Sequence, residues 1–317
     1  MSRQMGVGVA FALVFPGQGS QSVGMMQPYS DLPEVRATFE EASEALAFDV
    51  WELVENGPAE ALNRTVNTQP VMLIAGIAVL RAWRAIGGQE PAAVAGHSLG
   101  EYSALVAAGV LAFADAVRLV RFRAQCMQEA VPEGTGGIAA ILGLDEAAVD
   151  SVCAEAAQGE VLEAANYNAP GQVVIAGHRS AVERGMALAK ERGAKRAVML
   201  PMSAPSHCSL MKPAADRVRE RLASMDLRAP DVTLINNVDV QSPRDPEAIR
   251  DCLVRQMHAP VRWVEVVRTM VDQGIGHIVE CGPGGVLTAL DKRIAPEAQC
   301  IALKDAGQVR ELAGSLR

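Results

Sequence analysis

Short apolar runs that alternate with helix-like segments are the feature that most limits how this chain can fold. Runs typical of buried strands lie at 10–15, 92–97, 232–236, 277–281 and 300–303. Segments with helical periodicity separate them, at 34–47, 70–86, 101–111, 115–130, 209–225, 246–257, 260–273 and 284–294. This alternation predicts an α/β fold with a mostly parallel sheet that helices cover on both faces. Half of the residues are apolar and only 4% are aromatic, which suits strands buried by Ala, Val, Leu and Ile.

The middle of the chain follows a different order. Strand-like runs lie at 137–144, 160–166, 171–177 and 195–200, and helical segments lie at 145–157 and 179–193. We expect the sequence YNAP (167–170) to form the turn between the second and third of these strands. The order β-α-β-β-α-β is the ferredoxin-like pattern. We therefore predict a ferredoxin-like inserted domain at 131–202, within a main domain built from 1–130 and 203–317.

Charge and cysteine spacing argue against several classes of function. The net charge is −8, whereas nucleic-acid-binding proteins are usually basic. The six cysteines form no CxxC pair and no His/Cys cluster has zinc spacing, so we expect reduced thiols, a cytoplasmic location and no metal. The apolar run at 71–80 is too short to span a bilayer, so we expect a buried helix and no membrane attachment. The apolar run after Arg3 lacks a signal-peptide cleavage site and should be the first core strand.

The glycine-rich sequence FPGQGSQ (15–21) follows the first expected strand and raises the question of a phosphate-binding loop. Gly17 and Gly19 match the start of a dinucleotide fingerprint, but the third glycine is absent. No lysine follows these glycines, as a Walker loop would require. The phosphate interpretation is therefore weak, and these residues alone favour a simple turn between a strand and a helix.

The sequence GHSLG (96–100) provides a candidate nucleophile. It is a G-x-S-x-G motif between a short apolar run and a helix, which is the context of a nucleophile elbow. The sharp turn would expose the Ser98 hydroxyl at the carboxyl end of the strand. The N–H of Leu99, at the start of the helix, would then face an oxyanion. The alternative is a structural serine, because this motif also occurs by chance.

A serine nucleophile needs a base, and the best candidate among the five histidines is His207. It follows a loop with prolines and stands at the expected start of the helix 209–225, where Ser206 could be the N-cap. The N-terminus of a helix disfavours imidazolium, so His207 should be a neutral base. The alternative is a histidine that only caps the helix. His97 adjoins Ser98 and should shape the site. His178 and His277 are expected to be structural, and His258 is expected to be a loop residue.

An arginine lies on the apolar face of the helix expected at 115–130. Arg118 and Arg121 fall on the solvated side, whereas Arg123 falls within the apolar arc. A buried arginine is costly unless a partner compensates its charge. Two interpretations stay open from periodicity alone: an internal salt bridge, and a site for an external carboxylate or phosphate.

These motifs resemble those of the malonyl-CoA:acyl-carrier-protein transacylase family. The resemblance covers nearly the whole chain and rests on FPGQGSQ, GHSLGEYSAL, RAQCMQ, ANYNAPGQVVIAG, APSHCSLM, RQMHAPVRW and VECGPGGVLTAL. It implies an α/β-hydrolase-like core with a ferredoxin-like insert. It also implies transfer of malonyl from malonyl-CoA to the phosphopantetheine thiol of acyl carrier protein in fatty-acid synthesis, with no cofactor.

The resemblance also implies roles for individual residues. Ser98 would be the nucleophile, His207 the base, and Arg123 the group that binds the malonyl carboxylate. The backbone N–H groups of Gln18 and Leu99 would form the oxyanion hole. The GQG sequence would then be bent to aim an amide at an acyl oxyanion and not to hold a phosphate.

Further positions follow from the same resemblance. The backbone carbonyl of Gln256 would orient His207, which makes the site a dyad without the acid of a hydrolase triad. His97, Asn166 and Asn168 would shape the site. In related polyketide acyltransferases the residue before the base helps to separate malonyl from branched units such as methylmalonyl. The small Ser206 and its APSH context fit the fatty-acid enzyme.

Acyl carrier proteins of this family are acidic, so docking requires a local basic surface on this acidic chain. The candidates are two pairs, Lys195 with Arg196 and Lys292 with Arg293, although such pairs are more often ordinary solvated charge.

Two other functions remain as alternatives. A serine thioesterase would supply an acid between Ser98 and His207, and Asp115, Asp145 and Asp150 lack the loop context of a triad acid. A non-catalytic carrier-binding module would not need the Ser, His and Arg set.

Overall fold

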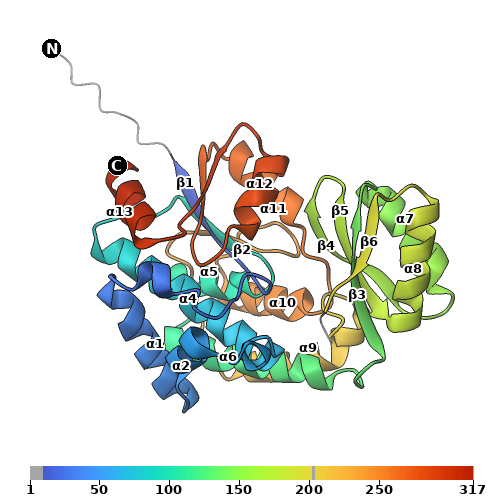
Figure 1. Cartoon of the computed structure of the whole chain (residues 1–317), viewed down its shortest axis with the longest axis horizontal. Helices are drawn as coiled ribbons and strands as arrows, with labels where there is room; N and C mark the ends of the chain where they lie inside the picture. The colour runs from blue at the N-terminus through green and yellow to red at the C-terminus, as the bar shows by residue number, and fades with distance from the viewer. Residues whose placement is uncertain (1–9, 202–203, 317) are drawn as a thin grey trace.

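The computed structural model describes residues 10–201 and 204–316 and contains two sheets (Figure 1). The first is a five-stranded sheet with the order β7-β2-β1-β8-β9. Its strands are β1 (Phe11–Phe15), β2 (Ala93–Gly96), β7 (Thr233–Ile235), β8 (His277–Glu280) and β9 (Gln299–Ala302). All four pairings between these strands are parallel. The predicted parallel sheet is therefore confirmed, and β1 forms the end of the apolar run expected to be the first core strand, whose residues up to 9 lie outside the described residues.

The central strand β1 explains why its sequence is apolar without alternation. All five of its residues are buried. Leu13 and Phe15 belong to the core on one face of the sheet, whereas Ala12 and Val14 belong to the core on the other face. A parallel strand covered on both faces needs apolar side chains at every position.

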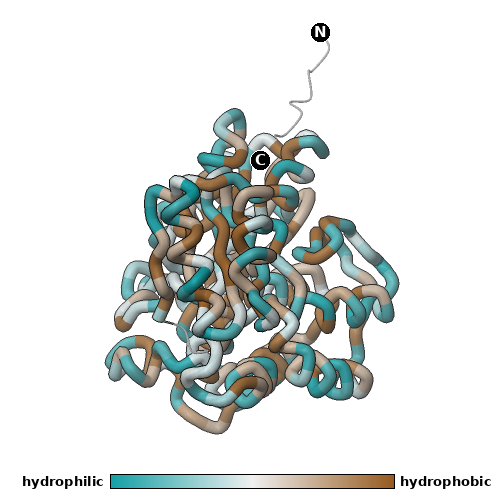
Figure 2. The backbone as a smooth tube through the Cα atoms, turned by 90° about the vertical axis from the view of Figure 1, so that its right-hand side faces the viewer, coloured by the Kyte–Doolittle hydropathy of each residue, from teal (hydrophilic) through white to brown (hydrophobic). Residues whose placement is uncertain are grey.

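Helices cover both faces of this sheet (Figure 1). The helices of this part of the protein are α1 (Pro33–Leu46), α2 (Val50–Asn56), α3 (Ala59–Leu62), α4 (Thr65–Ala85), α5 (Gly100–Ala107), α6 (Phe113–Glu129), α9 (Lys212–Ala223), α10 (Pro246–Gln256), α11 (Trp263–Asp272), α12 (Val286–Ile294) and α13 (Ala306–Ser315). Short 3₁₀ turns lie at Gln27–Tyr29 and Ser209–Met211. Figure 2 shows hydrophobic segments through the interior and hydrophilic segments around the periphery.

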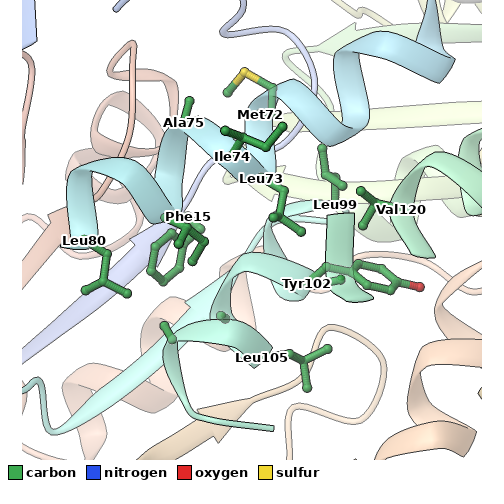
Figure 3. Close-up of a cluster of buried hydrophobic side chains, with 14 of the residues drawn as sticks. Phe15, Met72, Leu73, Ile74, Ala75, Leu80, Leu99, Tyr102, Leu105 and Val120 are labelled. Carbon is green, nitrogen blue, oxygen red and sulfur yellow. The ribbon is translucent and has the colours of Figure 1, made fainter. Parts of the chain in front are cut away.

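The helix α4 is long and apolar enough to cross a membrane, but most of it is buried inside the protein. Residues 71–80 are all buried, as the sequence predicts. Figure 3 shows Leu73 of α4 in one cluster with Phe15, Leu99, Tyr102 and Val120. This helix is therefore part of the core directly beneath the GHSLG turn.

The second sheet is antiparallel, with the order β4-β5-β3-β6. Its elements are β3 (Gly136–Leu142), α7 (Glu146–Ala157), β4 (Leu162–Ala169), β5 (Gln172–His178), α8 (Arg179–Glu191) and β6 (Arg196–Met199). This β-α-β-β-α-β order matches the ferredoxin-like pattern expected from the sequence. Figure 1 shows α7 and α8 together on one face of the sheet.

The prediction of a turn at 167–170 is wrong, because most of this segment belongs to a strand. Strand β4 continues through Ala169, and Tyr167 and Ala169 pair with Val173 and Gln172 of β5. The segment stays extended because it also pairs with the other part of the protein: Val261 N–H donates to Ala165 O, and Tyr167 N–H donates to Val261 O, both at 2.9 Å. Backbone hydrogen bonds thus join β4 of the antiparallel sheet to the segment between α10 and α11. The domain boundaries at 131 and 202 stay a prediction, and residues 202 and 203 lie outside the described residues.

Candidate active site

Ser98 stands on a sharp turn between β2 and α5. Its φ is +52°, in the left-handed region that non-glycine residues rarely adopt. A Cβ atom on Gly96 would lie 1.9 Å from the backbone of Gly100, so the strand can turn this tightly into the helix only with a glycine there. The G-x-S-x-G spacing therefore has a steric reason, and the turn has the form of a nucleophile elbow.

Asn237 holds this turn from the neighbouring strand. It follows β7, at the carboxyl edge of the parallel sheet, and its side chain is buried. Asn237 Oδ1 accepts from Ser98 N–H at 2.7 Å, and Asn237 Nδ2 donates to Gly96 O at 2.8 Å. We did not predict this residue from the sequence. Its position after a parallel strand was the available signal, because polar residues at that edge converge on a common site.

His207 contacts Ser98 with the geometry of a serine–histidine pair. His207 Nε2 lies 2.6 Å from Ser98 Oγ, and His207 Nδ1 lies 2.8 Å from Gln256 O. A carbonyl can only accept, so Nδ1 carries the proton and Nε2 is free to accept from the serine hydroxyl. Within 10–201 and 204–316, no carboxylate hydrogen-bonds His207. The pair is a dyad oriented by a backbone carbonyl.

The helix expected to begin at His207 begins later. α9 starts at Lys212, and a 3₁₀ turn from Ser209 to Met211 precedes it. Ser206 is not its N-cap, and His207 lies in a turn with φ +62°. The helix terminus therefore does not explain the neutral base. Burial, with a further contribution from the Arg123 guanidinium, lowers the pKa of His207 to about 3.

Arg123 is buried on α6 and points its guanidinium at the site. Its Nη1 donates to Gln69 Oε1 at 2.7 Å, and its Nη2 donates to Gln256 Oε1 at 3.1 Å. Nη2 also lies 3.4 Å from Ser98 Oγ, and Nε has no hydrogen-bond partner among the residues that the structure describes. No acid among the described residues forms an ion pair with Arg123. Of the two interpretations left open by periodicity, the internal salt bridge is wrong.

These groups border one small cavity of about 150 Å³. Residues from the parallel-sheet region line one side: Gln18, Gln69, His97, Ser98, Leu99, Arg123, Met127, Ser206 and His207. Residues from the antiparallel sheet and its last connection line the other: Ile138, Asn166, Asn168, Val174 and Leu200. Drug-sized ligands usually occupy cavities of roughly 300–1,000 Å³, so this one suits a short acyl group.

The GQG sequence lies directly over the elbow. A Cβ atom on Gly17 would lie 2.7 Å from His97 O, so this position needs a glycine for the loop to come so close. Gln18 and Leu99 both line the cavity, and neither of their backbone N–H groups donates to another residue in the described part of the chain. Two unpaired amides beside Ser98 are the donors that an oxyanion hole requires.

The remaining predicted site residues fall into two groups. His97 Nε2 lies 2.7 Å from Asn168 Oδ1, and Asn166 is buried on β4, so these three residues do shape the cavity wall. The four basic residues are exposed and do not line the cavity. Arg293 instead donates to Gln172 Oε1 and Pro170 O, which ties α12 to the antiparallel sheet.

Comparisons with known proteins identify the family. A family model described as an acyl transferase domain matches residues 12–317. The malonyl CoA-acyl carrier protein transacylase of Salmonella typhimurium is 56% identical over 296 residues, which cover 93% of this chain and 96% of that protein. The chain belongs to the malonyl-CoA:acyl-carrier-protein transacylase family. The protein of the same name from Bacillus subtilis is 44% identical over 296 residues, 93% of each chain.

Solved structures agree with this assignment. An acyl-carrier-protein S-malonyltransferase from Burkholderia pseudomallei matches with a TM-score of 0.95 at 55% identity, over 96% of this chain and 99% of that chain. A malonyl-transacylase in complex with a type II PKS acyl-carrier protein matches with a TM-score of 0.95 at 50% identity, over 96% and 99% of the two chains. The fold and family expected from the sequence are therefore confirmed.

Besides Asn237, sequence reasoning missed two buried polar residues of this transacylase-family site. Gln69 lies on α4, inside an apolar helix, and holds Arg123. Glu101 lies on α5, three residues after Ser98, and accepts from Gln256 Nε2 at 2.8 Å. For both, the available signal in the sequence was a polar residue on an otherwise apolar, buried helix face, which indicates a residue with a specific buried partner. In the part of the chain that the structure describes, no group of three or more His, Cys, Asp or Glu residues could hold a metal ion.

Proposed function

We propose that this protein transfers a malonyl group from malonyl-CoA to the phosphopantetheine thiol of an acyl carrier protein, through a malonyl ester on Ser98. One observation carries the proposal: the buried guanidinium of Arg123 lies 3.4 Å from Ser98 Oγ without an acidic partner in the described chain. A short acyl group attached to Ser98 would place a terminal carboxylate against that guanidinium. Membership of the transacylase family supports the same reaction.

In the first half-reaction His207 Nε2 accepts the proton of Ser98 Oγ as the oxygen attacks the thioester carbonyl. The negative charge that develops on the carbonyl oxygen is stabilised by the N–H groups of Gln18 and Leu99. The C–S bond then breaks, and the imidazolium of His207 protonates the departing CoA thiolate. Ser98 is left as a malonyl ester, and His207 is neutral again.

In the second half-reaction the thiol of the carrier protein occupies the position that CoA has left. His207 takes the thiol proton as the sulfur attacks the ester carbonyl, and the same two amides stabilise the oxyanion. The C–O bond breaks, His207 returns the proton to Ser98 Oγ, and malonyl leaves as a thioester. The chemistry needs only side chains and amides of this chain, so we propose no cofactor and a cytoplasmic enzyme of fatty-acid synthesis.

A thioesterase is the nearest alternative because water could replace the thiol. The dyad argues against it, because Gln256 O orients His207. In the described part of the chain no carboxylate takes the place of the acid that serine hydrolases commonly use. Selectivity for malonyl over methylmalonyl is also part of the proposal. Ser206 is buried and lines the cavity next to His207, where an α-methyl group would need room.

The test follows the label of radioactive malonyl-CoA in the presence of holo carrier protein, with apo carrier protein as the control. We expect the label on the holo form only, and little free malonate. Malonate release that does not depend on the carrier would support the thioesterase, and no use of malonyl-CoA at all would refute the proposal. Methylmalonyl-CoA and acetyl-CoA in the same assay measure the acyl selectivity.

A further inference from the structure

The charge of Arg123 is balanced indirectly. Its Nη2 donates to Gln256 Oε1 at 3.1 Å, and Gln256 Nε2 donates to Glu101 Oε2 at 2.8 Å. The side-chain amide of Gln256 therefore stands between a guanidinium and a carboxyl group, with its oxygen toward the cation and its N–H toward the acid. Through this arrangement the guanidinium faces the cavity without a direct contact to any described acid.

Glu101 is itself an unusual residue at this place. Its side chain is only 2% exposed, and burial of a carboxylate is costly unless a cation or several donors compensate it. Glu101 Oε2 accepts from Gln256 Nε2 and from Asn237 N–H at 3.1 Å. No described residue donates to the other oxygen, Oε1. Glu101 therefore contacts both residues that hold the site, and one of its oxygens is free to take a proton.

Of the other described groups that face Glu101, Arg123 alone carries a charge that no neighbour compensates. These groups are Tyr102 on its own helix, Arg123 on α6, Asp239 after β7 and Cys252 on α10. Burial raises the pKa of Tyr102 and of Cys252 to about 12, so both are neutral. Arg255 donates to both carboxylate oxygens of Asp239 at 2.7 Å, which compensates that charge. Arg123 and Glu101 are thus the two charges that remain to balance each other.

We propose that Glu101 is the resting counter-ion of Arg123 and takes up a proton when the malonyl carboxylate pairs with Arg123. This inference rests on the proposed function. The proton comes from solvent and binds Oε1, while Oε2 continues to accept from Gln256 and Asn237. The negative charge brought by malonyl is compensated by the proton, so the charge of the buried site stays constant. When malonyl leaves on the carrier thiol, the proton returns to solvent.

The ionisation of Glu101 agrees with this geometry. Burial raises the pKa of Glu101 to about 7, and Arg123 is one of the groups that lower it against burial. A malonyl carboxylate that neutralises Arg123 would remove this lowering effect, so the pKa of Glu101 would rise further. Near neutral pH the bound state then holds more protons than the free state.

The test measures protons directly, with the Ser98→Ala variant, which can bind malonyl-CoA without becoming acylated. Titration calorimetry near neutral pH, in two buffers of different ionisation enthalpy, gives the number of protons taken up on binding. We expect roughly half a proton or more per malonyl-CoA, and none with acetyl-CoA, which brings no carboxylate. Binding of malonyl-CoA with no proton uptake between about pH 6 and 8 would overturn the inference but not the proposed function. Absence of malonyl-CoA binding would overturn both.

A second variant assigns the proton to Glu101. In the Ser98→Ala background, Glu101→Gln should abolish the uptake, whereas Glu280→Gln should retain it. Glu280 is a matched control because it is a buried carboxyl that caps α12 and lies outside the cavity lining. Uptake that survives Glu101→Gln would overturn the assignment.

In otherwise wild-type enzyme, the KM for malonyl-CoA should fall as the pH is lowered through about 7. Glu101→Gln should flatten this pH profile of KM and affect kcat less. If Glu101→Gln does not fold, infrared difference spectra between free Ser98→Ala and its complex with isotope-labelled malonyl-CoA test the proposal instead. A new band from a protonated carboxyl group of the protein is expected on binding, and its absence would refute the proposal.

Discussion

The two sheets of this protein border the same cavity but hold it in different ways. The parallel sheet and its helices supply Ser98, His207 and Arg123, and hydrogen bonds fix each of these groups. Buried polar side chains hold Ser98 and Arg123, and the backbone carbonyl of Gln256 orients His207. The antiparallel sheet supplies a wall in which Ile138 and Val174 are apolar. Its links to the parallel-sheet region beside the cavity include the backbone pairing of β4 with Val261 and the contact between Asn168 and His97.

The difference follows from the architecture of the sheets. Parallel strands bring their carboxyl ends to one edge, so residues distant in sequence, such as Ser98 after β2 and Asn237 after β7, meet there. An antiparallel sheet with helices on one face leaves the other face to cover a neighbour. We therefore expect changes in the parallel-sheet region to affect the chemistry, and changes in the antiparallel region to affect the fit of the acyl group and the carrier protein.

The largest effect is expected for Ser98→Ala, which removes the nucleophile. Covalent labelling by malonyl-CoA should disappear, with little change in thermal stability, because the lost hydroxyl lies at the cavity and not in the core. Intact-mass spectrometry checks the adduct. Ser103→Ala is a matched control, since Ser103 is buried on α5, the helix that follows the Ser98 turn, and lies outside the cavity lining; it should keep the adduct. A labelled Ser98→Ala protein would remove the nucleophile assignment.

His207→Ala should follow, with a loss of about 10²–10⁴-fold in the rate of Ser98 acylation, as is typical of general-base catalysis. Stopped acylation reactions quantified by mass spectrometry measure the rate. The control is His178→Ala, because His178 belongs to the antiparallel sheet and its Nδ1 accepts from Val161 N–H. If both variants lose the same activity, the division of labour between the two sheets is refuted.

Arg123→Ala should change selectivity more than rate. A charge-assisted contact contributes about 1.5–3 kcal/mol, and acetyl has no carboxylate to pair. The ratio of malonyl to acetyl turnover should therefore fall by roughly tenfold or more. Arg121→Ala, on the same helix but with its guanidinium over Phe48, should leave the ratio unchanged. Equal losses on both substrates would make Arg123 a structural residue.

The smallest effect is expected on the outer surface of the antiparallel sheet. Lys195 and Arg196 are exposed at the start of β6, and we propose that they attract an acidic carrier protein. Replacing both by Glu should raise the KM for the carrier and leave acylation of Ser98 by malonyl-CoA unchanged. The defect should shrink at high salt, where exposed charges more than about 8–10 Å apart are screened. Slowing of both half-reactions would contradict docking here, and no change in either would direct attention to Lys292 and Arg293.

The sequence predicted the strands and the nucleophile turn well because each of them depends mainly on residues that are close together in the chain. The apolar run at 10–15 and the GHSLG motif each report a backbone environment that neighbouring residues create. The prediction that His207 stands at the start of α9 was wrong. His207 lies in a turn that is fixed by hydrogen bonds to Met257 O and Gln256 O, 50 and 49 residues away. The turn at 167–170 was wrong for the same reason, since Val261 keeps that segment extended.

The polar network beneath the site was least accessible from the sequence. Asn237 contacts Ser98 across 139 residues, and Gln256 contacts Glu101 across 155. The local pattern around each residue does not show which partner it meets, because the two members of each pair lie on elements that are far apart in the sequence. Only the parallel topology, which brings their elements to one edge, makes them part of the site.

The most direct test of this account is the intact mass of the wild-type protein after incubation with malonyl-CoA, before and after addition of holo carrier protein. The account predicts one malonyl group per chain, mapped to Ser98 by peptide analysis. It predicts that this ester persists in buffer and moves to the carrier when its thiol is supplied. An adduct at another residue, or an adduct that decays to free malonate equally fast with and without the carrier, would contradict it.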